Sequence, residues 1–301
     1  MQRTTFFGSN HVASVARGAY LCVASFGLFT LQDAAIKWLV VEHSVIEVLF
    51  WRSVTILVIC YSHGGKDLYV QSMASPALWK LVGRALVAGA AWLLYYTASR
   101  TVSLAQMTTL YFSAPIIVTV LSSVLLKERT GLYRWGIVIL GFVGVVIASR
   151  PTGEIALTST LMILAAAALW AYGLILLRSQ AMLASITQQV VITNVVYLAM
   201  MLPALPWVWS AQILNEVVAM LAIGVIGGAA QYLAFSSYRY APASILAPFE
   251  YTGLIWAFLL SWLIWGETPD TGLIAGAVLI AISGVAGLYA AITQRSQNEV
   301  P

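Results

Sequence analysis

The chain has 301 residues, of which 61% are hydrophobic and only 9% are charged, and its mean hydropathy is +0.89. Soluble globular domains are about 45–50% apolar and roughly 25% charged, so this composition excludes a soluble protein and indicates an integral membrane protein. The net charge of +4 is small and does not indicate a nucleic-acid partner.

Taken in order, the chain opens with a short segment, residues 1–17, that is too polar for a cleavable signal peptide. A membrane-spanning helix needs about 20 apolar residues, and ten runs of the chain come near that length. The sequence therefore predicts an all-α integral membrane protein with ten transmembrane helices. These predicted spans lie at residues 18–39, 45–62, 78–99, 103–126, 132–149, 157–177, 187–209, 213–237, 243–265 and 271–293. The longest connection, residues 62–77, is too small for a separate soluble domain.

Two stretches of the chain, residues 103–128 and 242–267, resemble each other at a spacing of 139 positions. Each is apolar, contains proline and hydroxyl residues, and ends in a glutamate. An internal repeat sets the architecture, so we expect two halves of five helices each. An odd number of helices per half inverts the second half in the membrane. Inverted repeats often build secondary transporters, in which rocking of the halves exposes a midplane site to each side in turn.

Positive charges are divided unequally between the two predicted faces. With a cytoplasmic N-terminus, eleven Lys and Arg residues lie at or near the inner face, whereas the outer face receives Lys37, Arg100 and Arg150. This bias follows the positive-inside rule. It predicts that both termini are cytoplasmic.

Features spread over nearly the whole chain resemble a known family. They are aromatic-rich first helices ending in a cation (Phe29 to Lys37, Trp170 to Arg178), Arg52 in the second predicted helix, and helix-ending glutamates followed by glycine-spaced helices (Glu128 with Gly136 and Gly144, Glu267 with Gly276 and Gly284). With the five-plus-five plan, they resemble the EamA family of the drug/metabolite transporter (DMT) superfamily, and most of all its YddG-type amino-acid exporters. The resemblance implies that residues 1–150 and 151–301 are two inverted EamA-like repeats.

The same resemblance implies a multi-pass transporter of the bacterial inner membrane that exports small metabolites, above all amino acids including aromatic ones. Its implied partners are the small-molecule substrate and the lipid bilayer, and the chain would be a monomer or weak homodimer with no cofactor. A different cargo by proton antiport stays open, such as a purine, riboflavin or a quaternary ammonium drug. So does a different class, a membrane-embedded enzyme or receptor-like helical protein.

Motifs for catalysis or for ATP binding are absent from the sequence. The histidines at positions 11, 43 and 63 lack metal-ligand spacing. Neither a G-x-S-x-G elbow nor a G-x-x-x-x-G-K loop occurs. We therefore expect no enzyme and no metal site, and transport that is downhill or coupled to an ion gradient.

Ionisable side chains within predicted spans are the first candidates for function, because a charge in the bilayer is costly. Asp33, Arg52 and Glu250 are predicted to act in coupling or charge pairing, and Arg84 is a further cation. A purely structural role stays open for each. Asp33 could pair with Arg52 or Lys37, and Glu250 with Arg239 or with backbone donors.

Aromatic and polar side chains at helical spacing are the second group of candidates. A pocket with apolar walls and a few polar groups suits a zwitterion with an apolar side chain, with Trp170 and Tyr95 favoured first. In the fourth predicted span, Gln106 shares a polar face with Thr109 and Ser113, opposite Tyr111. Packing and interfacial aromatic belts are the competing explanation. The predicted substrate-binding residues are Gln32, Asp33, Trp92, Tyr95, Gln106, Tyr111, Trp170, Tyr172, Gln231, Glu250 and Tyr251.

Overall fold

The computed structural model describes residues 5–114, 117, 121, 132–149, 154–180, 182–240, 246, 249–250 and 252–298, and these residues form helices and connecting loops without a strand. The helices are α1 (Thr5–Leu39), α2 (Val45–Met73), α3 (Leu78–Ala98), α4 (Leu104–Tyr111), α6 (Leu132–Ser149), α7 (Glu154–Gln180), α8 (Ile186–Met201), α9 (Leu205–Val208), α10 (Leu214–Tyr240), α12 (Thr252–Trp265) and α13 (Thr271–Asn298). The predicted all-α class is confirmed for this part of the chain.

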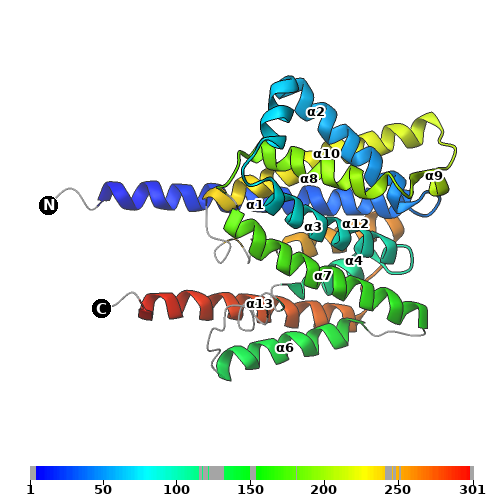
Figure 1. Cartoon of the computed structure of the whole chain (residues 1–301). Coiled ribbons are helices and arrows are strands. Elements are labelled where there is room, and N and C mark those ends of the chain that lie inside the picture. The colour runs from blue at the N-terminus through cyan, green and yellow to red at the C-terminus, as the bar shows by residue number, and fades with distance from the viewer. Residues whose placement is uncertain are drawn as a thin grey trace.

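Figure 1 shows the helices packed as one bundle, in which the start of α1 and the end of α13 lie on the same side. We call that side the terminal end. The opposite side, where α1 and α3 finish and α2 and α10 begin, is called the loop end. Most of the helices therefore run along a common direction, as antiparallel neighbours in a membrane bundle do.

Within the described residues, five helical segments are long and apolar enough to cross a membrane. They are residues 16–39, 45–73, 78–98, 157–177 and 214–240. Four shorter apolar helical stretches coincide with further predicted spans, at residues 139–148, 186–201, 252–265 and 271–283. The tenth predicted span, 103–126, lies partly outside the described residues. The chain is thus a multi-pass membrane protein.

Two predicted loops are helical instead. The segment expected to be a loop at 62–77 continues α2 as far as Met73, with a break at Gly65, where φ is 57° and ψ is −160°. Glycine adopts this conformation readily because it has no Cβ. Beyond the break the chain folds back on α2, where the Tyr69 hydroxyl donates to the carbonyl oxygen of Leu57 at 2.6 Å. The polar opening segment likewise becomes helical at Thr5. Polarity marked the end of the apolar run in both places, but it does not end a helix.

Serine caps set the start of several helices. Ser44 precedes α2 and Ser185 precedes α8, and each forms a reciprocal capping box, with Glu47 and Gln188 respectively. Ser103 accepts from the backbone N–H of Gln106 at the start of α4. Such caps satisfy backbone donors that a helix terminus leaves free. The second helix of each predicted half therefore starts in the same way.

Small residues bring the two halves into close contact. Helices α6 and α13 run side by side along one edge of the bundle (Figure 1), and a Cβ placed on Gly276 would lie 2.6 Å from the carbonyl oxygen of Gly144. Such close backbone approach is typical of membrane helices that associate through glycine. Helix α1 packs in the same manner along α10, so each half contributes to the centre of the bundle.

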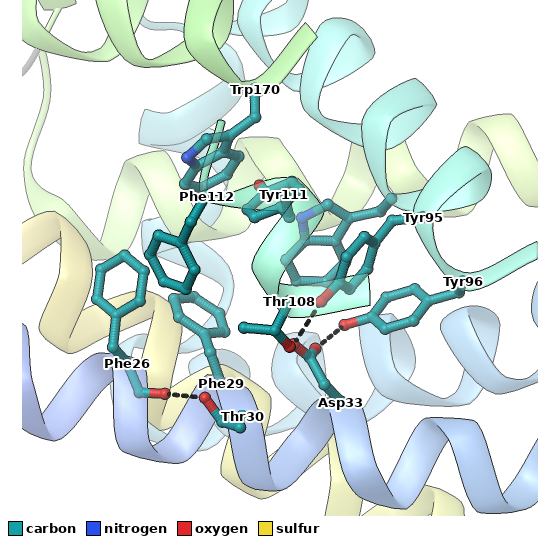
Figure 2. A pocket seen from close by; sticks show the side chains of 11 residues that line it. Phe26, Phe29, Thr30, Asp33, Tyr95, Tyr96, Thr108, Tyr111, Phe112 and Trp170 are labelled. Carbon is teal, nitrogen blue, oxygen red and sulfur yellow. Dashed lines mark hydrogen bonds between the residues drawn. The ribbon is translucent and has the colours of Figure 1, made fainter. Parts of the chain in front are cut away.

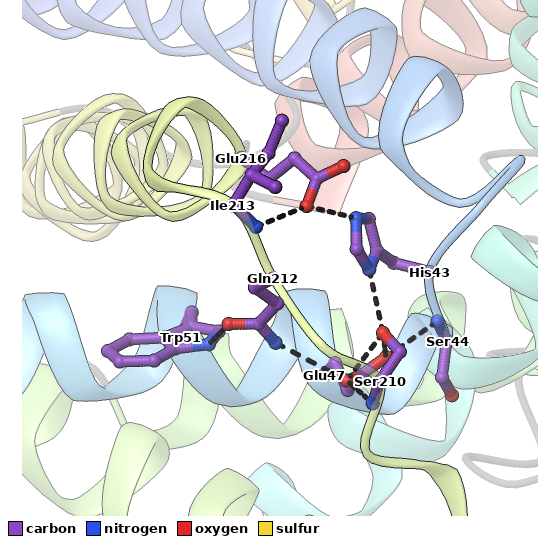
Figure 3. A network of polar contacts seen from close by, with 8 residues as sticks. All are labelled: His43, Ser44, Glu47, Trp51, Ser210, Gln212, Ile213 and Glu216. Carbon is purple, nitrogen blue, oxygen red and sulfur yellow. Dashed lines mark hydrogen bonds and ion pairs between the residues drawn. The ribbon is translucent and has the colours of Figure 1, made fainter.

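A polar network ties the two halves together at the loop end (Figure 3). Its centre is the buried carboxylate of Glu47 on α2, which accepts from the backbone N–H groups of Ser44 at 3.0 Å and Ser210 at 2.6 Å. The ring of His43 contacts the Ser210 hydroxyl through Nδ1 at 2.9 Å and the Glu216 carboxylate through Nε2 at 3.2 Å. These contacts join the α1–α2 connection and the first turn of α2 to the α9–α10 connection and the start of α10.

Candidate functional site

A cavity at the centre of the bundle gathers most of the predicted aromatic candidates (Figure 2). Its space outside protein atoms, counted with the solvent to which it opens, is about 550 Å³. Helices α1, α3 and α7 and the end of α4 supply its walls, with Asp33 as the charged side chain in the lining. We call it the Asp33 cavity. Its lining residues are Phe26, Phe29, Thr30, Asp33, Trp92, Tyr95, Tyr96, Thr108, Tyr111, Phe112 and Trp170.

Two phenols of α3 hold the Asp33 carboxylate. The hydroxyl of Tyr96 donates to Oδ1 at 2.7 Å, and the hydroxyl of Tyr95 donates to Oδ2 at 3.3 Å. Consecutive residues of one helix can both reach the carboxylate because α1 and α3 lie close together at this level. Within the described residues Asp33 forms no ion pair, and its carboxyl group faces the cavity with neutral hydrogen-bond partners around it.

The predicted alternative, in which Asp33 pairs with Arg52 or Lys37, is therefore wrong. The Lys37 ammonium donates to the carbonyl oxygens of Ser99 at 3.2 Å and Val102 at 2.6 Å, at the C-terminal end of α3. One helical turn separates Lys37 from Asp33, and the lysine side chain is used to cap the neighbouring helix.

Arg52 occupies a fully buried cross-link next to the cavity. Its Nε donates to Gln32 at 2.8 Å, and its two terminal nitrogens approach Asn194 Oδ1 and the carbonyl oxygen of Gly227, each at 3.4 Å. The guanidinium carbon lies 4.1 Å from the ring centroid of Trp92. Gln32 in turn donates to the Tyr96 hydroxyl at 2.7 Å. A chain of hydrogen bonds thus connects Arg52, in α2, with the Asp33 carboxylate and with α8 and α10.

Gly227 is required at this cross-link. A Cβ there would clash with Gln32 Oε1 and would lie 2.7 Å from Arg52 Nε. Glycines in membrane helices commonly allow two backbones to approach closely, but a contact between a glycine and a buried arginine is a different use. It allows α10 to approach a charged side chain rather than another helix backbone.

A second cavity lies nearer the terminal end, and its space outside protein atoms, counted with the solvent to which it opens, is about 630 Å³. Its walls come from α1, α3, α7, α8 and α10, and its lining includes Arg84, Thr193, Tyr197, Gln231, Phe235 and Tyr238. We call it the Arg84 cavity. Four residues line both cavities and form the wall between them, which we call the aromatic girdle: Phe26, Phe29, Trp92 and Trp170. The Phe29 and Trp92 rings meet edge to face with centroids 6.2 Å apart.

Many of the predicted binding residues lie at these cavities. Asp33, Tyr95 and Tyr111 line the Asp33 cavity, Trp92 and Trp170 belong to the girdle, and Gln231 lines the Arg84 cavity. Gln32 lies behind the lining, in the Arg52 cross-link. Their predicted role in binding stays a prediction, and their positions are compatible with it.

Other predicted residues lie elsewhere. Tyr172 is 40% exposed on the outside of α7 and lines neither cavity, because two residues along a helix turn a side chain through about 200°. Gln106 is also absent from both linings. The α4 residues that reach the Asp33 cavity are Thr108, Tyr111 and Phe112, on the side opposite to the predicted polar face. Tyr251 lies outside the described residues.

Glu250 is buried behind the wall of the Arg84 cavity. The hydroxyl of Tyr238, a lining residue, donates to Glu250 Oε1 at 2.7 Å. Arg239, the partner considered from the sequence, donates to the carbonyl oxygen of Ala184 at 2.6 Å. Glu250 is therefore positioned to act on the cavity through Tyr238 rather than as a lining residue.

The sequence analysis missed several lining residues, among them Phe26, Tyr96, Phe112 and Tyr238. Only Tyr96 had a usable signal, because it belongs to the same aromatic stripe of α3 as Trp92 and Tyr95. The combination of aromatic walls with a few placed polar groups is typical of small-molecule sites. No group of His, Cys, Asp and Glu side chains in the described residues could hold a metal ion.

Comparison with known proteins gives one family. The EamA-like transporter family matches the chain twice, at residues 16–150 and 157–289. The two matches fall on the two predicted halves. Each cavity is lined from both matched regions, since α1 and α3 belong to the first and α7 to the second.

Individual relatives are transporters with different cargoes. The chain is 27% identical over 294 residues to an uncharacterized transporter of Helicobacter pylori, covering 95% of each chain. It is 25% identical over 275 residues to the pseudopaline exporter CntI of Pseudomonas aeruginosa, covering 89% of this chain and 95% of the exporter. It is 27% identical over 181 residues to an S-adenosylmethionine uptake transporter of Rickettsia bellii, covering 59% and 62% of the two chains.

Proposed function

Because the chain belongs to the EamA-like transporter family, we propose that it is a secondary transporter of the bacterial inner membrane that exports small metabolites. Amino acids, including aromatic ones, are the proposed cargo. In this proposal the protein has ten transmembrane helices in two inverted five-helix repeats, and both termini are cytoplasmic. The unequal distribution of Lys and Arg supports that orientation. The relatives include both an exporter and an uptake transporter, so the direction of transport is part of the proposal.

The observation that carries the proposal is the aromatic cavity with a single facing carboxylate. Asp33 offers an acceptor for an ammonium group, and Tyr95 and Tyr96 hold its two oxygens in place. The girdle rings offer flat apolar surfaces for a side chain, and a ring face also attracts a cation. An amino acid with an aromatic or other apolar side chain matches both the carboxylate and the aromatic rings of this lining.

The girdle also suggests how such a substrate would pass. Phe26, Phe29 and Trp92 come from the first matched region, and Trp170 comes from the second. Rocking of one half against the other would separate these rings and change which cavity is continuous with the outside. The network of Glu47 and Ser210 would break when the loop end opens, because it joins the same two halves. This sequence of events is alternating access.

A second candidate cargo is a cationic metabolite or drug exchanged for protons. It is favoured by the same carboxylate, because Asp33 forms no ion pair within the described residues and could bind a proton and a cation in turn. Neutralisation of Asp33 would then remove the dependence of flux on a pH gradient. An amino-acid facilitator would instead keep its flux when the gradient is collapsed.

The test is flux through purified protein in proteoliposomes. Vesicles are loaded with Trp, Phe, Met and Thr, and efflux is followed with and without a pH gradient. Two variants of α7 make a matched pair. Trp170→Ala removes a girdle ring, and Tyr172→Ala removes a ring from the outside of the same helix.

We expect efflux above that of empty vesicles. We expect Trp170→Ala to reduce it at least about tenfold, since a partly buried Trp contributes on the order of 2 kcal/mol of contact. Tyr172→Ala should transport as the unmodified protein does. No efflux of any amino acid would overturn the proposed cargo. Equal loss in both variants would show that the girdle is not the pathway.

A further inference from the structure

Arg84 is a buried cation whose charge has no ionic partner in the described part of the chain. Its side chain is 4% exposed. One terminal nitrogen donates to Gln189 Oε1 at 2.8 Å, and the other lies 3.5 Å from the Thr193 hydroxyl. The guanidinium carbon lies 4.9 Å from the ring centroid of Phe235. Its contacts are therefore neutral acceptors and an aromatic face, and no salt bridge to Arg84 is found among the described residues.

This guanidinium lines a cavity, which distinguishes it from a packing residue. The other walls of the Arg84 cavity are mainly apolar and aromatic, with the polar groups of Thr193, Gln231 and Tyr238. A guanidinium has five N–H donors in a planar fork, and the two contacts with α8 leave donors for a ligand. A buried charge away from water is costly unless it is paired, so an anion in the cavity would offset that cost.

The two charged cavities lie at different depths. Arg84 precedes Tyr95, which holds Asp33, by eleven positions of α3, or about 16 Å of helix axis. The ammonium and carboxylate groups of one amino acid are bonded to the same carbon. A small zwitterion therefore cannot contact Asp33 and Arg84 at once.

From this geometry we infer that the Arg84 cavity is a second station of the pathway, which binds the carboxylate group of the cargo. A carboxylate matches the guanidinium fork with two parallel hydrogen bonds. The inference rests on the proposed function for its cargo, but the anion site itself does not depend on which amino acid is carried. An amino acid would be held by its carboxylate at Arg84 on one side of the girdle and by its ammonium at Asp33 on the other.

The test uses two probes that differ in charge and little in shape, 4-fluorophenylacetate and 4-fluorophenylacetamide. Their affinities for the full-length protein in lipid nanodiscs are measured by fluorine NMR. We expect the anion to bind at least about tenfold more tightly than the amide, as charge-assisted hydrogen bonds exceed neutral ones. Arg84→Gln should make the two affinities equal. Tyr172→Ala, the control on the outside of α7, should leave the preference for the anion unchanged.

Arg84→Lys covers the case in which Arg84→Gln does not fold. This variant keeps the positive charge but loses the planar fork of donors. The preference for the anion over the amide should therefore become smaller without disappearing. Equal affinities in the unmodified protein, or a preference that survives Arg84→Gln, would overturn the inference. An Arg84-dependent preference without amino-acid flux would retain the anion station and reject the proposed cargo. Amino-acid flux together with equal affinities for the two probes would retain the proposed cargo and reject the anion site.

Discussion

Two buried arginines on neighbouring helices, Arg52 on α2 and Arg84 on α3, differ in what lies in front of them. Both are nearly inaccessible, both lie against an aromatic ring, and both donate to neutral side chains of α8. Arg52 is surrounded by acceptors from α1, α8 and α10 and lines neither cavity. Arg84 contacts acceptors of α8 and faces open space.

The difference shows that burial and residue type do not decide the role of a charge in a membrane bundle. A guanidinium whose donors are used by several helices fixes those helices relative to one another. A guanidinium that keeps donors toward a cavity is available to a ligand. On this basis Arg52 is a structural cross-link beneath the site, and Arg84 belongs to the pathway.

The two arginines should differ most in their contribution to the free energy of unfolding. Arg52→Met leaves Gln32 Oε1, Asn194 Oδ1 and the Gly227 carbonyl without the donor they share. Each buried acceptor without a partner costs about 1–3 kcal/mol, so the free energy of unfolding should fall by roughly 3 kcal/mol. Arg84→Met should cost about 1 kcal/mol, because it leaves one close acceptor, Gln189 Oε1 at 2.8 Å, and one weakly held acceptor, the Thr193 hydroxyl at 3.5 Å.

Unfolding of the detergent-solubilised protein, followed by tryptophan fluorescence in a denaturant series, measures both variants. Equal losses of stability would show that Arg84 is also a structural cross-link. A stable Arg52→Met variant would show that the network around Gln32 rearranges without it.

A smaller effect on transport and stability is expected at Tyr96, where the Arg52 cross-link reaches the Asp33 cavity. Tyr96 donates to Asp33 and accepts from Gln32, both at 2.7 Å, whereas Tyr95 donates to Asp33 at 3.3 Å. Tyr96→Phe breaks two hydrogen bonds and should raise the KM for efflux several-fold, with a stability loss of about 1–2 kcal/mol. Tyr95→Phe should change both quantities less.

Transport kinetics in proteoliposomes measure the effect of each variant on KM, and unfolding in detergent measures its effect on stability. If Tyr95→Phe proves the more damaging variant, the Asp33 carboxylate is held mainly by Tyr95 and not by Tyr96. If neither variant changes KM, Asp33 does not take part in binding.

The class of fold was predictable because composition and the length of apolar runs respond directly to the bilayer. The ends of the helices were less predictable. The helix α2 passes through the polar residues around Ser62 and breaks at Gly65, since backbone hydrogen bonding continues a helix in water as it does in lipid. The repeat was visible as a sequence pattern, and the family matches fall on the same two halves.

The site was predictable where a residue type is costly in the membrane. Asp33 was found because a carboxylate in a span requires an explanation. Phe26 and Phe112 could not be found, because a phenylalanine facing a cavity and one facing lipid look alike in a sequence. Trp170 and Tyr172 were both candidates, with Trp170 favoured, and the direction of α7 places Trp170 at the cavities and Tyr172 on the outside of the helix.

The partners of the charged groups were the least predictable part. The sequence allowed an ion pair of Asp33 with Arg52, and the structure inserts Gln32 and Tyr96 between them. Which pairs of helices touch at a given depth is a property of packing, and Gly227 on a distant helix decides it here as much as the charges do.

In the proposed transport cycle the two cavities form one pathway that the aromatic girdle interrupts, and the accessibility of engineered thiols can test this arrangement. Single cysteines are placed at Ala88, in the Arg84 cavity, and at Thr108, in the Asp33 cavity, after replacement of the buried Cys22 and Cys60. The exposed His63→Cys serves as the reactive control.

A membrane-impermeant thiol reagent is then added to either face of the membrane. We expect Ala88→Cys to be labelled from the face that carries the chain termini and Thr108→Cys from the opposite face, with both reactions slowed by a transported amino acid. Absence of labelling at both positions from either face, with His63→Cys reacting normally, would contradict a pathway through these cavities.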